Sequence, residues 1–196
     1  VQIQAAHGFL LSQFLSSHFN HREDEYGGSL ENRCHLLRRV VKSVKEAVSP
    51  TFAVFVKLNQ SDELEDGIIF EEAVEVAKIL EESHVDCIEV SCGLVGSKEG
   101  LPNRAIIRKE EEGYNFEAAC RIADYVSVPI LAVGGFRTFS EIEGCLQKSK
   151  VKGISLCRPF ICEPDLPKKW FADSTYQPRC KSCNQCFMTN PLHCTL

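Results

Sequence analysis

The stretch Val-Pro-Ile-Leu-Ala-Val-Gly-Gly-Phe-Arg-Thr, residues 128–138, decides the fold class. Its apolar run Ile130–Val133 is short and continuous, which is typical of a strand buried on both faces of a parallel sheet. Gly134–Gly135 follows the run and predicts a tight turn, and a new helical pattern starts at Thr138 or Ser140. A buried strand, a glycine turn and a helix make up one β/α unit.

The same unit recurs along most of the chain, because short apolar runs alternate with amphipathic runs. Strands are predicted at Val1–Gln4, Phe52–Leu58, Cys87–Val90, Ile130–Val133 and Gly153–Leu156. Helices are predicted from Leu30, with Ser29 as the N-cap, up to Ser49–Pro50, and then at Phe70–Leu80, Phe116–Val126, Thr138 or Ser140 to Leu146, and Glu163–Phe171. Strict alternation predicts right-handed crossovers and a parallel sheet.

Two α/β architectures fit this alternation: an open doubly wound sheet and a (β/α)₈ TIM barrel. The first strand is not followed by a G-x-G-x-x-G turn, which argues against a dinucleotide-binding sheet. A whole barrel takes about 250 residues, so five units in 196 residues correspond to a barrel without its first three units. We expect the C-terminal portion of the barrel at 1–172 and a Cys-rich extension at 173–196. The absence of a starting Met also suggests a fragment or a processed chain.

Composition excludes several classes of protein. The net charge of −5 does not favour a nucleic-acid partner. There is no apolar run near the ~20 residues of a membrane span, and no secretory signal is evident. Seven of the eleven cysteines are scattered among apolar positions, as expected for reduced, buried thiols in a cytoplasmic protein.

Two loops at strand ends predict a phosphate-bearing ligand. Glycines such as Gly134–Gly135 let backbone N–H groups approach a phosphate, although an ordinary tight turn would also explain them. The loop after the next strand carries Arg158, whose guanidinium matches a phosphate, and barrels commonly bind phosphate after their last two strands. Lys57 lies in an apolar strand, where a cation needs a negative or electron-rich neighbour. A snorkelling surface lysine and an amine catalyst of an aldolase or isomerase are the alternatives for Lys57.

Longer motifs resemble the old yellow enzyme family of NADH:flavin oxidoreductases. The resemblance begins with Ala-Ala-His-Gly-Phe-Leu-Leu-Ser-Gln-Phe-Leu-Ser at 5–16 and Asn-His-Arg-Glu-Asp-Glu-Tyr-Gly-Gly-Ser-Leu-Glu-Asn-Arg at 20–33. It continues through 56–62, 88–93, 133–135 and 155–165, and it covers most of the chain up to about Trp170. The resemblance implies an FMN-binding barrel that takes hydride from NAD(P)H and passes it to a small, electron-poor, enone-like acceptor.

Carried over by position, the resemblance makes Val1–Gln4 the fourth barrel strand and Gly153–Leu156 the eighth. It places Lys57 beside the N1–O2 edge of the flavin, where a cation stabilises the reduced ring. It assigns the rest of the cofactor site to Val133, Gly134, Gly135, Cys157 and Arg158.

The acceptor side departs from the family pattern. Family members usually have His or Asn at the two positions that hydrogen-bond the acceptor, and here these are Gln4 and His7. The usual proton-donating Tyr is replaced by Phe9, which has no proton to give, and losing a general acid typically costs about 10²–10⁴ in rate. The resemblance therefore implies an oxidoreductase with an altered proton-donor site. The alternative is a catalytically impaired or non-catalytic flavin-binding barrel fragment.

The cysteine-rich tail is a second chemical signal. Cys180, Cys183 and Cys186 have C-x-x-C-x-x-C spacing, and Cys194 follows after seven intervening residues. Four thiolates could hold a [4Fe–4S] cluster, as in larger relatives of old yellow enzyme, or a tetrahedral Zn²⁺, and unfilled thiols are the third alternative. The exposed strand edges of a partial barrel also predict pairing with a second copy or with a missing N-terminal half.

Overall fold

A computed structural model describes residues 1–95 and 109–196 of the chain. Its sheet has five parallel strands in the order β1-β2-β3-β4-β5, so each strand pairs with the next one along the chain. The strands are β1 (Gln2–Ala5), β2 (Phe55–Asn59), β3 (Cys87–Ser91), β4 (Ile130–Val133) and β5 (Gly153–Ser155). Sequential parallel pairing through helical crossovers is the arrangement of a barrel wall, and it confirms the predicted C-terminal portion of a (β/α)₈ barrel.

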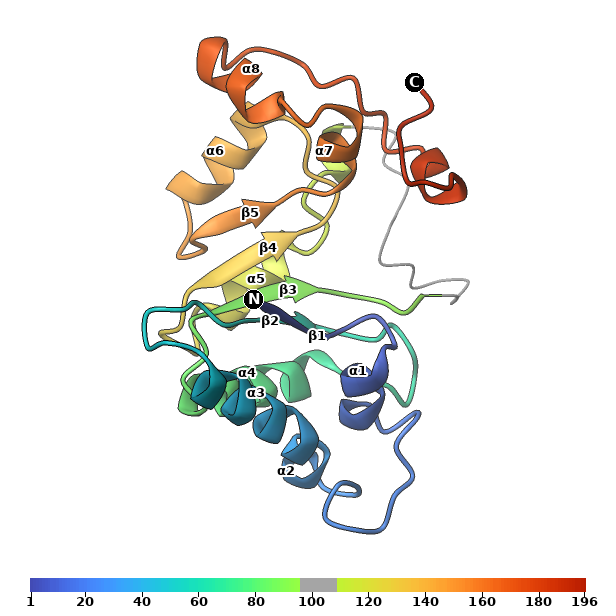
Figure 1. Ribbon diagram of the computed structural model, residues 1–196, viewed down its shortest axis with the longest axis vertical. Helices are drawn as coiled ribbons and strands as arrows, with labels where there is room; N and C mark the ends of the chain where they lie inside the picture. Colours follow the sequence, from blue (N-terminus) through green and yellow to red (C-terminus); the bar gives the residue numbers. More distant parts are fainter. Residues whose placement is uncertain (96–108) are drawn as a thin grey trace.

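Eight helices connect or follow these strands in the described residues (Figure 1). They are α1 (Leu10–Leu15), α2 (Leu30–Arg33), α3 (His35–Ala47), α4 (Phe70–Glu82), α5 (Phe116–Ile122), α6 (Phe139–Gln147), α7 (Arg158–Cys162) and α8 (Leu166–Ala172). Two 3₁₀ turns, Lys109–Glu111 and Gln185–Met188, complete the elements. None of the described helices is long and apolar enough to cross a membrane.

The sheet is strongly curved, as a barrel wall must be. Glu89 on the central strand β3 accepts hydrogen bonds at one carboxylate oxygen from Gln2 Nε2 at 3.0 Å and from Ser155 Oγ at 2.8 Å. Gln2 and Ser155 lie on β1 and β5, the two outer strands. In a flat sheet each outer strand would be about 10 Å from β3, because neighbouring strands are about 4.8 Å apart. One oxygen can reach both strands only because the sheet bends around Glu89.

The structure corrects several predicted boundaries. The helix expected from Leu30 is interrupted at Cys34, which separates α2 from α3 while keeping near-helical backbone angles. The strand expected from Phe52 begins only at Phe55, because Phe52 belongs to a turn in which its N–H bonds the Ser49 carbonyl at 2.9 Å. The helix expected from Glu163 begins at Leu166.

Two short helices were not predicted at all. They are α1 and α7, of six and five residues, which follow β1 and β5. Each is too short to show a helical period in the sequence.

Candidate active site

A cavity at the carboxyl ends of the strands brings most of the predicted site residues together. Lys57, Val133, Cys157, Arg158 and His7 all line it. The remaining lining residues are Ser91, Tyr114, Gly135, Phe136, Ser155, Leu156, Pro159, Ser182 and Phe187. The cavity is therefore lined by residues at or after the carboxyl ends of all five strands and by residues of the cysteine-rich tail. Barrel enzymes have their active sites at this edge of the sheet.

The turn at Gly134–Gly135 forms a cradle that only glycine permits. Gly134 has φ of +151° and Gly135 has φ of +72°. A Cβ at Gly134 would lie 3.1 Å from the Tyr114 ring and from Asn115 Nδ2, closer than such contacts normally are. Asn115 Nδ2 in turn donates to the Val133 carbonyl at 2.7 Å, which fixes the end of β4. This close-packed turn fits the predicted role of holding a phosphate by its backbone.

Arg158, the other predicted phosphate residue, is the first residue of α7 and is 7% exposed. Its Nη1 donates to the Ser182 carbonyl at 3.1 Å and to Asn184 Oδ1 at 2.7 Å. Ser182 and Asn184 both adopt left-handed backbone angles, with φ of 52° and 64°. The tail therefore forms part of the cavity wall and orients Arg158, which the sequence had not indicated.

Lys57 forms an ion pair that the sequence analysis missed. Its Nζ lies 2.5 Å from Glu89 Oε1, and the two side chains are 17% and 8% exposed. The two residues are direct partners in the register between β2 and β3. Lys57 is therefore neither a snorkelling surface lysine nor the free amine that an aldolase or isomerase would need. The signal was present in the sequence, as opposite charges each in the middle of adjacent apolar strands.

The acceptor-side residues His7 and Gln4 contact each other. His7 Nε2 lies 2.7 Å from Ser91 Oγ, and its Nδ1 lies 3.4 Å from Gln4 Nε2. Burial and, secondarily, the charge of Lys57 lower the pKa of His7 to about 4, with Glu89 opposing the shift. His7 is thus a neutral imidazole near pH 7, suited to hydrogen bonding rather than to proton donation. Gln4 is absent from the cavity lining and approaches the site through His7.

Comparisons with known proteins agree with this geometry. The model of the NADH:flavin oxidoreductase / NADH oxidase family matches residues 1–174. The chain belongs to this family.

Relatives with known names or structures come from the same family. The chain is 38% identical to the NADH-dependent flavin oxidoreductase nadA of Aspergillus parasiticus, over 85% of this chain and 37% of the relative. A 2-naphthoyl-CoA reductase structure has a TM-score of 0.83 at 29% identity, over 95% of this chain and 28% of that one. The old yellow enzyme homologue from Zymomonas mobilis has a TM-score of 0.67 at 26% identity, over 93% of this chain and 51% of that one.

The chain is a part of what its relatives contain. It covers between 31% and 54% of the length of curated family members that it matches. The match confirms the predicted family resemblance and the barrel fold.

The cysteine tail does not form a metal site in the described residues. No group of three or more His, Cys, Asp or Glu side chains in that part of the chain is arranged to hold a metal. Cys180 and Cys186 are buried and Cys183 is exposed. Cys194 instead hydrogen-bonds Cys162 at the end of α7, and burial together with this contact raises the pKa of Cys162 to about 12. The described residues thus show no formed metal site in the tail, and the [4Fe–4S] and Zn²⁺ alternatives stay predictions.

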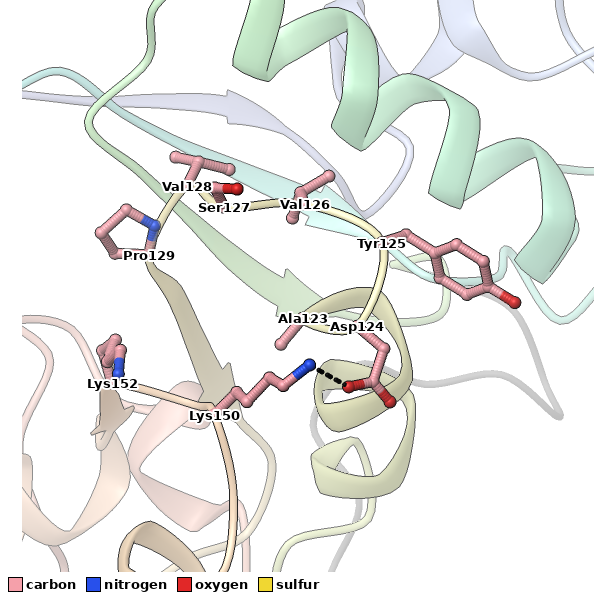
Figure 2. A pocket seen from close by; sticks show the side chains of 9 residues that line it. All are labelled: Ala123, Asp124, Tyr125, Val126, Ser127, Val128, Pro129, Lys150 and Lys152. Carbon is pink, nitrogen blue, oxygen red and sulfur yellow. Dashed lines mark ion pairs between the residues drawn. The ribbon is translucent and has the colours of Figure 1, made fainter.

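A second pocket lies at the opposite, amino-terminal ends of the last strands (Figure 2). It is formed by the turn 123–129 before β4 together with Lys150 and Lys152 before β5. Lys150 Nζ pairs with Asp124 Oδ1 at 2.8 Å, and both side chains are largely exposed. Among its described lining residues the charged side chains are exposed, unlike the buried Lys57 and Glu89 of the candidate active site.

Proposed function

We propose that the protein carrying this chain is an FMN-dependent NAD(P)H oxidoreductase that reduces a small, electron-poor, enone-like acceptor. The main support is the single cavity in which Gly135 of the glycine cradle, Arg158 and Lys57 meet, with Gly134 next to the lining residues Val133 and Gly135. Family membership supports FMN and NADH as the partners of this cavity.

The residues of the cavity divide into two groups by chemistry. Gly134, Gly135 and Arg158 would hold the phosphate of FMN through backbone N–H groups and a guanidinium, with Val133 and Cys157 beside them. Lys57 would lie against the flavin ring. FMN, when bound, supplies the hydride-accepting and hydride-donating chemistry that no side chain can provide.

His7 and Gln4 would bind the acceptor by hydrogen bonds. Because His7 is neutral near pH 7, it polarises a carbonyl without delivering a proton. Phe9 is about half exposed and offers no hydroxyl, so the proton for carbon has to come from another donor, such as water or a hydroxyl of the cavity lining. We therefore propose slow reduction of ordinary enones and normal reduction of the flavin.

The first test is an absorption spectrum of the full-length protein purified without oxygen. We expect a yellow protein that oxidises NADH or NADPH. A colourless protein that ignores added FMN would contradict the proposal. Replacing Phe9→Tyr should raise enone turnover by about 10²-fold or more while leaving flavin reduction by NAD(P)H unchanged. The non-catalytic alternative predicts FMN binding without NAD(P)H oxidation in both proteins.

The cysteine tail, the assembly and the location complete the proposal. We propose that Cys180, Cys183, Cys186 and Cys194 are reduced thiols of a tail segment at 173–196 that follows the barrel portion 1–172. Iron analysis of the anaerobic protein tests this, since a cluster would give about four iron atoms per chain. The outer strands β1 and β5 are proposed to pair with the remaining barrel strands or with a second copy, in a cytoplasmic protein.

A further inference from the structure

Glu89 is a buried carboxylate with an unusual number of side-chain partners. It is 6% exposed and accepts hydrogen bonds from Lys57 Nζ at 2.5 Å, Gln2 Nε2 at 3.0 Å and Ser155 Oγ at 2.8 Å. Burial works to raise its pKa, but these three donors keep the pKa below the usual value. Glu89 is therefore a carboxylate anion near neutral pH.

Glu89 contacts Lys57 without lining the cavity itself. Lys57 and Ser155 are among the cavity-lining residues, whereas Glu89 is not. Lys57 therefore borders the cavity and has an opposite charge in direct contact. Since His7 is neutral, the charges of Lys57 and Glu89 balance each other in this part of the site. Among the described lining residues, Arg158 carries the other positive charge.

We propose that Glu89 is a positioning residue that sets the charge Lys57 presents to the cavity, and so the preference of the site for reduced over oxidised flavin. This inference rests on the proposed function. A cation beside the ring favours the electron-rich, reduced state. A carboxylate in direct contact with that cation opposes the effect, because in a poorly hydrated site both charges act over several ångströms. Glu89 also holds the flexible Lys57 side chain in one place.

The test uses the full-length, FMN-loaded protein and the variant Glu89→Gln, which keeps the shape and removes the charge. Sulfite, an anion that adds to oxidised flavin, reports the positive charge near the ring. We expect Glu89→Gln to tighten sulfite binding by about tenfold, because Lys57 loses its counter-ion. If Glu89→Gln also binds reduced flavin about tenfold more tightly relative to oxidised flavin, the midpoint potential of the flavin rises by about 30 mV for a two-electron couple.

Two further variants separate charge from folding. Glu89→Asp keeps the charge and should stay close to the parent in both measurements. Glu163→Gln is the matched control, because Glu163 is also buried, also pairs with a lysine (Lys169, 2.7 Å) and does not line the cavity. It should lose stability but keep the parent's sulfite affinity and potential. A shift in Glu163→Gln equal to that in Glu89→Gln would overturn the proposal.

If Glu89→Gln does not fold, Lys57→Gln is compared with the double variant Lys57→Gln/Glu89→Gln over a series of pH values up to about 9, because high pH favours the ionised form of a buried carboxylate. The double variant should bind sulfite more tightly than Lys57→Gln, and equal binding overturns the inference. A parent that binds FMN, with an unchanged Glu89→Gln, overturns the inference and leaves the proposed function intact. A parent that binds no FMN overturns both.

Discussion

Two lysine–carboxylate pairs of the barrel portion differ mainly in burial. Lys57 and Glu89 are 2.5 Å apart with side chains 17% and 8% exposed, in the middle of β2 and β3 and next to the candidate active site. Lys150 and Asp124 are 2.8 Å apart with side chains 67% and 62% exposed, at the amino ends of the last strands (Figure 2). Although the two distances are similar, breaking the pairs should cost very different free energies of unfolding. Water screens the Lys150–Asp124 pair and hardly reaches the Lys57–Glu89 pair.

The largest expected effect comes from breaking the buried pair. Glu89→Ala leaves Lys57 without its counter-ion and should lower the free energy of unfolding by about 3–5 kcal/mol. Urea unfolding of the full-length protein measures this. A loss below about 1 kcal/mol would mean that Lys57 reaches water easily and that the two pairs are equivalent.

The next effect concerns the glycine cradle of the candidate active site. Gly134→Ala forces a Cβ against Tyr114 and Asn115 in a conformation that L residues rarely adopt. We expect a loss of about 1–3 kcal/mol in stability together with weaker FMN retention. Gly144→Ala is the control, because a Cβ at this helical position meets nothing within 4 Å and alanine favours helix. An FMN affinity that is unchanged in Gly134→Ala would argue against the cradle as a phosphate site.

The stability of the protein should also depend on pH through His7, which lies in the candidate active site. The pKa of His7 falls from 6.5 to about 4 on folding, mainly through burial. The unfolded chain therefore takes up a proton at His7 more readily, so this residue's stabilisation is complete above pH 6.5 and is lost as the pH falls towards 4. His7→Gln should show a shallower decline in urea midpoint over this interval. Identical slopes in parent and variant would show that His7 is exposed to water in both states.

The smallest effect is expected at the exposed pair. Asp124→Ala should change the free energy of unfolding by less than about 1 kcal/mol, since exposed ion pairs contribute little and are screened by salt. In high salt, the free energies of unfolding of the parent and of Asp124→Ala should become equal, because salt screens the Lys150–Asp124 pair. A loss comparable to that of Glu89→Ala would contradict the comparison of the two pairs.

Much of the fold could be predicted because buried parallel strands are apolar and glycine turns follow them. The bounds of β4 and the glycine turn that follows it at Gly134–Gly135 were visible in one short stretch. The boundaries of α1 and α7 were not, since helices of six and five residues show no period. Lys57 and Arg158 were recognised as cations near the ligand, but their partners were not. Glu89 faces Lys57 through the register of β2 and β3, a pairing of opposite charges that the sequence analysis overlooked. Asn184 reaches Arg158 through the path of the tail, which no sequence pattern indicates.

The contacts of Glu89 also have a consequence for how the chain folds. The hydrogen bonds from Gln2 and Ser155 join residues 87 and 66 positions away along the sequence. Such contacts of high sequence separation close large loops and are completed only when β1 and β5 have both been placed. We therefore expect the centre of the barrel to acquire its electrostatic balance late in folding, after the local β/α units have formed, so that refolding rates should be less sensitive to Glu89 than unfolding rates.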